Sequence, residues 1–255
     1  MKVVILAGGF GTRLSEYTEL IPKPMVSIGN KPILFHIMQI YSKFGFNDFY
    51  IALGYKSEVI LEYFKNYKSS EEIINEENKN NKNISSYNIK DLNWNVNLIY
   101  TGEKTMTGGR IKRMKKFIGN ETFLLTYGDG LSNVDINKLK EFHFKHGKIV
   151  TVTAVRPPAR FGTLVLEGNK VINFREKSQM DEGWVNGGYF VINSKFLDHI
   201  NDDSTFLERE PLENLSKSGD LQAYKHEGFW QPMDSKRDRD RLEEMYLKGD
   251  TPWIS

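Results

Sequence analysis

The feature that most constrains this fold is a short apolar run that leads directly into a glycine-rich turn. Residues 3–6 are continuously apolar, which is typical of a parallel strand that is buried on both faces. Gly8, Gly9 and Gly11 follow, and without a Cβ atom their backbone N–H groups can approach an anion closely. The pattern therefore predicts a first strand and, directly after it, a loop that holds phosphate.

Two cations near this loop strengthen the phosphate interpretation. Arg13 offers a planar fork of donors, and Lys23 lies between Pro22 and Pro24, which stiffen its backbone. Three glycines alone would suit an ordinary turn between a strand and a helix, and the motifs of dinucleotide sites and P-loops are both absent from the sequence. The glycines together with Arg13 and Lys23 indicate a nucleotide site.

Helical and strand patterns alternate after the loop. Apolar residues recur at helical spacing in 31–45 and 57–67, and apolar runs at 49–53 and 96–100 predict buried strands. This order requires a parallel sheet with right-handed crossovers. We therefore expect an α/β fold with a Rossmann-like, mostly parallel central sheet that helices flank.

We expect one domain of 255 residues with three parts. Residues 1–150 form a nucleotide-binding lobe, residues 151–230 form a smaller α/β lobe, and residues 231–255 supply a C-terminal helix that closes the core. Within the smaller lobe, strands at 163–166 and 171–174 predict a hairpin.

Residues 68–95 break the alternation because they are rich in Asn, Lys, Glu and Ser. One interpretation is a mobile surface insertion. The other is an oligomerisation arm that packs on another subunit, which the apolar residues Ile73, Tyr87, Ile89 and Trp94 favour slightly.

Two acidic residues stand in loops where a metal site is expected. Asp129 lies between Gly128 and Gly130 after a predicted strand at 122–127, and open α/β sheets bind ligands at the carboxyl ends of their strands. An ordinary Asp-Gly turn is the alternative. Asp234 lies in a second loop, where Asp234 or Ser235 would also suit the first turn of the next helix as a cap.

A second glycine pair, Gly108 and Gly109, precedes Arg110 and opens a predicted helix. Helix N-termini attract anions, so Arg110 is placed in the site, whereas the basic residues that follow it are expected on a solvated face. Asn186 can both donate and accept hydrogen bonds, as sugar hydroxyl groups require, although a turn asparagine is the simpler interpretation.

Composition excludes several classes of protein. A net charge of +2 does not predict a nucleic-acid binder, and the lack of cysteine excludes disulfides and thiolate zinc sites. No apolar run approaches the roughly 20 residues of a membrane-spanning helix, and the apolar start is too short for a signal peptide. We expect a soluble, cytoplasmic protein with neither a nucleic-acid nor a membrane partner.

Together these motifs resemble those of the sugar-1-phosphate nucleotidyltransferase family. The combination is specific, although no single motif is, and it extends over nearly the whole chain. Within the family, the chain looks most like the members that transfer a cytidylyl group to glucose 1-phosphate. It has Gly-Gly-Arg and Gly-Asp-Gly where thymidylyl relatives usually have Gly-Leu-Ala-Gln-Ala and Gly-Asp-Asn. One departure is Ser178, which follows Lys177 where the family often has proline. The motifs lie at residues 6–14, 22–24, 31–34, 106–110, 126–130, 161–162, 176–177, 186–188 and 229–234.

The resemblance implies transfer from CTP to α-D-glucose 1-phosphate, with Mg²⁺ as cofactor, as a first step toward CDP-linked deoxysugars of surface polysaccharide. It implies a homo-oligomer, either a hexamer or another multimer. Lys23, Arg13 and Asp129 would be catalytic, and Asp129 and Asp234 would hold the metal. The implied nucleotide-binding residues are Leu6, Ala7, Gly8, Gly9, Phe10, Gly11, Thr12, Arg13, Lys23, Thr105, Gly109, Arg110 and Gly128. The implied sugar-phosphate-binding residues are Gly162, Glu176, Lys177, Asn186 and Gly187.

Two alternatives stay open at this point. The enzyme could use another nucleotide, such as dTTP or UTP, or another sugar phosphate. The chain could also be a regulatory subunit that binds a nucleotide without turning it over, although the presence of both acids and both cations argues against this role.

Overall fold

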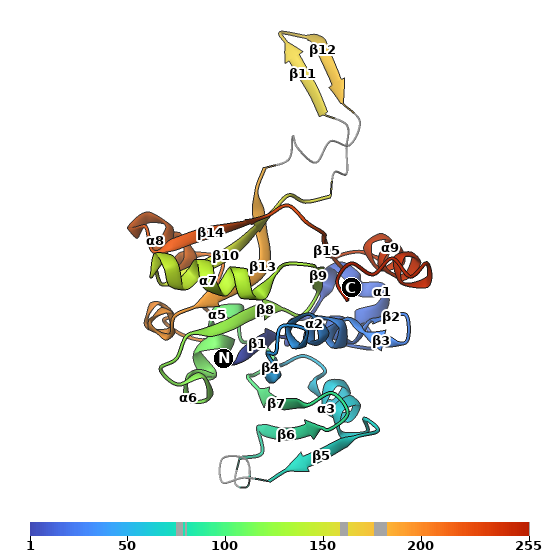
Figure 1. The fold of residues 1–255 in the computed structure, drawn as a ribbon, viewed down its shortest axis with the longest axis vertical. Helices are drawn as coiled ribbons and strands as arrows, with labels where there is room; N and C mark the ends of the chain where they lie inside the picture. Colours follow the sequence, from blue (N-terminus) through green and yellow to red (C-terminus); the bar gives the residue numbers. More distant parts are fainter. Residues whose placement is uncertain (75–78, 80, 159–162, 176–182, 255) are drawn as a thin grey trace.

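The computed structural model describes residues 1–74, 79, 81–158, 163–175 and 183–254, except for the side chains of residues 13, 15, 16, 163 and 175. Within these residues a nine-stranded sheet forms the centre of the molecule (Figure 1). Its spatial order is β14 (Leu221–His226), β10 (Val150–Val155), β13 (Val185–Ile192), β8 (Phe123–Tyr127), β1 (Val3–Leu6), β4 (Asp48–Leu53), β7 (Trp94–Tyr100), β6 (Ile84–Ile89) and β5 (Ser70–Ile73).

The middle of this sheet is parallel. β8, β1, β4 and β7 are neighbours that all run in one direction, as helical crossovers require. On one side β13 is antiparallel to both β8 and β10, while β14 is again parallel to β10. On the other side β6 and β5 are antiparallel additions. The predicted α/β fold with a Rossmann-like centre is therefore confirmed.

Helices cover both faces of the sheet. One apolar cluster packs α2 (Ile33–Ser42), α3 (Ser57–Lys65), α7 (Ile136–His146) and α9 (Lys236–Leu247) on one face. A second cluster packs α5 (Thr107–Arg113), α6 (Lys115–Ile118), the 3-10 helix η4 (Ser194–His199) and α8 (Glu210–Ser218) on the other. The shorter elements are η1 (Thr12–Leu14), α1 (Ser15–Thr18), η2 (Lys23–Met25), β2 (Ser27–Ile28), β3 (Lys31–Pro32), β9 (Gly130–Ser132) and β15 (Trp230–Pro232).

The first strand shows why a continuous apolar run was needed. Val3 and Ile5 belong to one apolar cluster, whereas Val4 and Leu6 belong to the other. All four side chains are buried, and each such burial stabilises the fold by about 1.5–3 kcal/mol. A polar residue at any of the four positions would face an apolar layer.

Residues 68–95 do more than interrupt the sheet. β5 and β6 extend it by two antiparallel strands, with register pairs such as Tyr87 with Val96 and Ile89 with Trp94. Trp94 is buried and donates a hydrogen bond to Ser42 Oγ at 2.8 Å. The apolar residues Ile84, Tyr87 and Ile89 are the signal for β6, and the polar composition of the segment obscured it.

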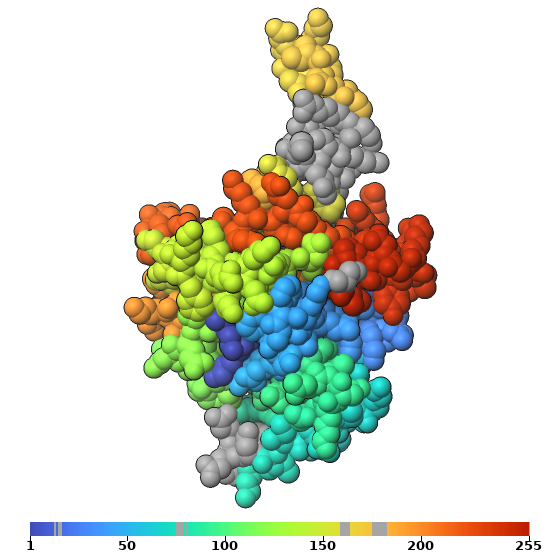
Figure 2. All heavy atoms as spheres, in the orientation of Figure 1, coloured from blue at the N-terminus to red at the C-terminus, as the bar shows by residue number. Residues whose placement is uncertain are grey.

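The predicted hairpin is present as β11 (Thr163–Glu167) and β12 (Lys170–Arg175). It lies apart from the central sheet in Figures 1 and 2, where it is the yellow segment at the top. Its apolar side chains are between 42% and 61% exposed. They are Leu164, Val165, Leu166, Val171, Ile172 and Phe174.

Some helix starts differ from the sequence expectation. Lys56, rather than Ser57, is the residue before α3, with a left-handed φ of 50°. α5 begins at Thr107, so Arg110 lies inside the helix instead of at its opening. Within the described ranges, none of the helices combines the length and the apolar character needed to cross a membrane.

Replacing the cap of α7 should weaken the fold measurably. The Asp135 carboxylate accepts a hydrogen bond from the backbone N–H of Lys138 at 3.0 Å. We expect Asp135→Ala to lower the free energy of unfolding by about 1 kcal/mol in urea denaturation. Glu141→Ala on an exposed position of the same helix should change it by less than about 0.5 kcal/mol. Equal effects of the two substitutions would contradict the capping role.

Candidate active site

A cavity of about 700 Å³ opens at the carboxyl ends of β1 and β8. Strand β13 and the segment before α5 form its other walls. Most of the residues predicted for the site line this cavity. They are Leu6, Ala7, Gly8, Gly9, Phe10, Gly11, Thr12, Lys23, Thr105, Arg110, Gly128, Asp129, Asn186, Gly187 and Asp234.

A short antiparallel ladder brings the two acids together. β9 pairs with β15 so that Gly130 lies opposite Pro232. Directly beyond this pair, the backbone N–H of Met233 donates to the carbonyl of Asp129 at 2.8 Å. The two acid-bearing loops are thus joined by backbone hydrogen bonds, which places Asp129 and Asp234 on the same wall of the cavity.

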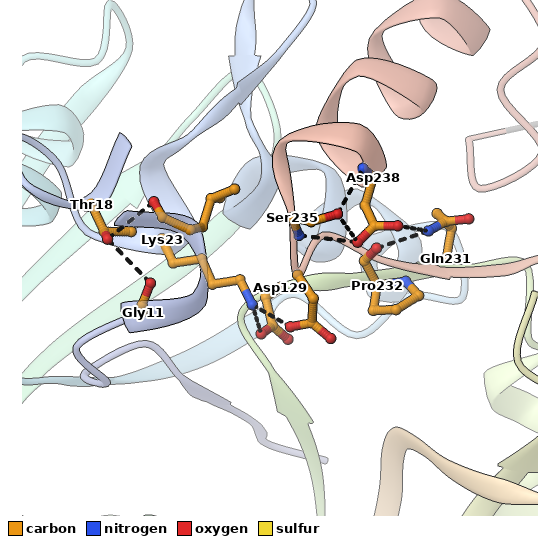
Figure 3. A network of polar contacts seen from close by, with 10 residues as sticks. Gly11, Thr18, Lys23, Asp129, Gln231, Pro232, Ser235 and Asp238 are labelled. Carbon is orange, nitrogen blue, oxygen red and sulfur yellow. Dashed lines mark hydrogen bonds and ion pairs between the residues drawn. The ribbon is translucent and has the colours of Figure 1, made fainter. Parts of the chain in front are cut away.

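Lys23 lies between these acids. Its Nζ is 2.7 Å from an oxygen of Asp129 (Figure 3). It is also 2.7 Å from an oxygen of Asp234. Burial alone would lower the pKa of Lys23, but the attraction of Asp129 and hydrogen bonds to both carboxylates raise it above its usual value. Lys23 is therefore a fixed cation at neutral pH, and two carboxyl groups face a single ammonium group.

The backbone around Lys23 is tightly constrained. Pro22 precedes η2 with φ of −68°, and Lys23 begins that turn with only 8% of its surface exposed. Gly11 approaches from the first loop with φ of +65°, and a Cβ atom there would lie 3.1 Å from Lys23 Cβ. The Thr18 hydroxyl donates to the Gly11 carbonyl at 3.1 Å, which fixes the loop against the lysine (Figure 3).

Ser235, and not Asp234, caps the next helix through a capping box. Ser235 is the residue that caps α9, and its side chain and backbone both bond Asp238 (Figure 3). Gln231 also donates to the Asp238 carboxylate at 3.2 Å. The alternative in which Asp234 itself caps the helix is therefore excluded, and the neighbouring network holds the loop in place.

Arg110 points inward and holds three loops together. The two terminal nitrogens of its guanidinium donate to the carbonyls of Gly8, Leu53, Gly102 and Glu103 and to the hydroxyl of Thr101. Burial lowers its pKa to about 10. Its terminal N–H groups are thus engaged by the protein itself, and a direct contact of Arg110 with the base stays a prediction.

Two glycines leave the space that this arginine occupies. A Cβ atom on either Gly8 or Gly54 would lie 2.4 Å from Arg110 Nη1. No side chain fits at such a distance, so the glycine at position 8 serves the packing of Arg110 as well as the approach of a phosphate. The same guanidinium therefore fixes the end of β1 and the end of β4.

Asn186 and Gly187 line the cavity from the first residues of β13. Asn186 Nδ2 donates to the Tyr127 hydroxyl at 3.2 Å, and its Oδ1 accepts from the N–H of Gly188 at 2.8 Å. Trp230 donates to the carbonyl of Gly187 at 2.8 Å. These contacts give Asn186 a defined orientation at the start of β13.

Several predicted residues are not placed in this cavity. Gly109 packs against the backbone of Asp203 instead of lining the cavity. Arg13 lies in η1, but its side chain is outside the described atoms, as are the whole of Gly162, Glu176 and Lys177. Their implied roles stay predictions.

The structure adds lining residues to which the sequence analysis gave no role. Most of them lie within the recognised motifs, as Tyr127 and Thr107 do. Glu103, Tyr189, Phe206 and Glu208 lie outside every motif, so only the fold brings them to the cavity. The added residues are Pro24, Glu103, Met106, Thr107, Thr126, Tyr127, Gly130, Gly188, Tyr189, Phe206, Glu208, Trp230 and Pro232.

The sequence profile described as nucleotidyl transferase matches residues 2–231. The chain belongs to this family. Membership of the nucleotidyl transferases agrees with a glycine-rich loop and an acid pair around one cavity, and it confirms the resemblance drawn from the motifs. A nucleotidyl transferase is an enzyme, and the cavity is the candidate for its active site.

Individual nucleotidyl transferases match over nearly the full length. The glucose-1-phosphate cytidylyltransferase of Salmonella typhi is 48% identical over 255 residues, covering 99% of this chain and 98% of that protein. HddC from Yersinia pseudotuberculosis is 26% identical with a TM-score of 0.70, covering 96% of this chain and 99% of that one. Apo-UDP-glucose pyrophosphorylase, at 17% identity and a TM-score of 0.70 over 98% of this chain and 99% of that one, shares the fold.

The clamp role of Arg110 predicts a large loss of stability on a conservative change. Arg110→Lys keeps the charge but cannot serve five acceptors on three loops. We expect it to lower the free energy of unfolding by about 2–4 kcal/mol, because buried carbonyls lose their donors. Arg113→Lys changes an exposed ion pair with Asp203 and should cost less than about 1 kcal/mol. Urea denaturation measures both, and an Arg110→Lys protein as stable as the Arg113→Lys protein would rule out the clamp.

Proposed function

We propose that the protein transfers the cytidylyl group of CTP to α-D-glucose 1-phosphate and releases pyrophosphate, forming CDP-glucose. The observation that carries this proposal is the placement of Lys23 between Asp129 and Asp234, at the mouth of the glycine-rich loop. The choice of nucleotide and sugar is supported by the named activity of the Salmonella typhi relative, which is 48% identical over its whole length.

The proposed reaction needs no nucleophile from the protein. A phosphate oxygen of glucose 1-phosphate attacks the α-phosphorus of CTP in line. The new oxygen–phosphorus bond forms as the bond to the pyrophosphate oxygen breaks, and the leaving electron pair stays on pyrophosphate. The attacking phosphate is already ionised near neutral pH, so no protein base is required, and catalysis consists of positioning and charge stabilisation.

Different residues of the cavity position the substrates and stabilise the charge. The backbone N–H groups of the first loop, from Gly8 to Gly11, suit the oxygens of a triphosphate. Lys23 is a buried cation held by Asp129 and Asp234, and it offsets negative charge at the reacting phosphorus. In our proposal Arg13 adds a second cation on the triphosphate. Asn186 and Gly187 orient the sugar, together with Gly162, Glu176 and Lys177.

The acid pair fits the magnesium ion that we propose as cofactor. Asp129 and Asp234 each place an oxygen at 2.7 Å from the same nitrogen, so they lie close enough together to share one small cation. Mg²⁺ is commonly held by one or two carboxylates, with water and substrate phosphates completing its shell. Once bound, it would supply charge stabilisation to the phosphates.

Activity measurements on two variants test the proposal. We expect Lys23→Ala and Asp129→Asn each to reduce kcat for CDP-glucose formation by at least about a hundredfold, because each removes charge stabilisation at the reacting phosphorus. Pyrophosphate release with each of CTP, UTP, dTTP and GTP, with mass detection of the sugar nucleotide, identifies the donor. Added chelator should abolish turnover and excess Mg²⁺ should restore it.

Matched controls on exposed positions separate chemistry from general damage. Lys138→Ala and Asp198→Asn change the same residue types outside the cavity and should leave kcat within about twofold. The proposal fails if Lys23→Ala and Asp129→Asn turn over at the rate of these controls, or if the wild-type protein binds CTP but forms no sugar nucleotide.

We further propose a cytoplasmic homo-oligomer, either a hexamer or another multimer. A cytoplasmic location gives the enzyme access to CTP. Two surfaces support assembly with further copies of this chain. β5 is the last strand of the sheet among the described residues, so its outer edge is open to pairing, which supports a contact through residues 68–95. The β11–β12 hairpin exposes six apolar side chains, and an isolated hairpin is only marginally stable.

Light scattering after size-exclusion chromatography tests the assembly. We expect a mass that is a multiple of the 29.5 kDa chain. Phe174→Asp and Leu166→Asp place charge on the hairpin and should lower that mass, whereas Lys170→Asp in the same hairpin should leave it unchanged. A monomeric wild-type protein would contradict the proposal.

A further inference from the structure

The cavity contains a network of hydrogen-bonded side chains that has no role in the proposed reaction. Its centre is Glu208, two residues before α8. One carboxylate oxygen accepts from the Tyr127 hydroxyl at 2.8 Å, and the other accepts from the Thr107 hydroxyl at 2.7 Å. Glu208 therefore joins the end of β8 to the start of α5.

Both neighbours of Glu208 are themselves held in place. Thr107 Oγ1 accepts from the backbone N–H of Leu207 at 2.9 Å, which leaves its own proton for Glu208. A carboxylate accepts hydrogen bonds, so the Tyr127 hydroxyl is the donor in its contact with Glu208. Asn186 donates to the same hydroxyl. The carboxylate thus has a fixed position and orientation within the cavity.

Glu208 differs from the two acids of the lysine site in its surroundings. Asp129 and Asp234 are paired with Lys23. Across the part of the chain that the structure describes, no basic side chain forms an ion pair with Glu208, and both of its contacts are neutral hydroxyl groups. An uncompensated carboxylate repels phosphate, so this part of the cavity suits a neutral portion of a substrate.

The carboxylate also has acceptor capacity to spare. An ionised carboxylate offers about four lone-pair sites, and Tyr127 and Thr107 use one on each oxygen. Hydroxyl groups are the neutral donors that match the remaining sites, and hydrogen bonds to a charged acceptor are stronger than those between neutral groups. The network therefore presents acceptors to a polyhydroxylated ligand.

We propose that Glu208 is a specificity-determining residue that accepts hydrogen bonds from hydroxyl groups of the acceptor sugar. The proposal rests on the proposed transfer to glucose 1-phosphate. The sugar is favoured over the ribose because Glu208, Tyr127 and Asn186 form one hydrogen-bonded chain, and Asn186 is the residue that we propose orients the sugar.

Kinetics with monodeoxy analogues tests this assignment. The wild-type protein is compared on glucose 1-phosphate and on its 2-, 3-, 4- and 6-deoxy analogues. We expect at least one analogue to lose roughly tenfold to hundredfold in kcat/KM, the loss that follows when a hydrogen bond to a charged group is removed. In Glu208→Ala the discrimination against that same analogue should fall below about threefold, and Glu208→Gln should be intermediate.

A purely structural role for Glu208 has a different outcome. It would lower kcat/KM by the same factor for glucose 1-phosphate and all four analogues, and this result would overturn the proposal. Parallel reactions with CTP and 2′-deoxy-CTP test the ribose. If Glu208→Ala abolishes only the preference for CTP, the carboxylate reads the ribose and the sugar assignment is wrong.

Two further measurements keep the outcomes distinct. Circular dichroism and thermal unfolding verify that each variant is folded, and Glu213→Gln, an exposed acid on α8, should retain wild-type discrimination. If the wild-type protein forms no CDP-glucose, the proposed function fails. If it forms CDP-glucose and Glu208→Ala keeps the full preference for hydroxylated sugars, only the inference on Glu208 fails.

Discussion

The contact of Lys23 with Asp129 and Asp234 is the interaction on which the site depends. The three residues come from separate segments, with Asp129 lying 106 positions and Asp234 lying 211 positions after Lys23. A buried ammonium group without partners would be costly, so the two carboxylates must be in place for the lysine to remain charged. The same carboxylates need a cation beside them, and this mutual requirement fixes the spacing of the three loops.

Sequence reasoning succeeded where the physical cause was local. The apolar run Val3–Leu6 predicted a strand buried on both faces, because the pattern of burial in a strand depends on a few neighbouring residues. The glycine loop, Lys23 and the two acids were also found, since glycine, proline and strand ends mark them. These residues do meet in one cavity.

The remaining features depend on contacts between distant segments. Arg110 was correctly placed near the cavity, but its engagement with carbonyls from three loops cannot be read from a Gly-Gly-Arg pattern. Glu208 lies outside every motif, and its place in the cavity is seen only from its hydrogen bonds with Tyr127 and Thr107. In residues 68–95, polar composition outweighed the few apolar residues of β6, because partners on β7 and not intrinsic preference stabilise that strand.

The ladder between β9 and β15 has a consequence for synthesis on the ribosome. Chains emerge from their N-terminus and begin to fold while the remainder is still being made. The first loop, Lys23 and Asp129 are thus available long before Asp234, which arrives with the last strand and α9. An incomplete nascent chain carries a phosphate-attracting surface without its second acid. The acid pair around Lys23 is therefore completed only after the segment that carries Asp234 has been made.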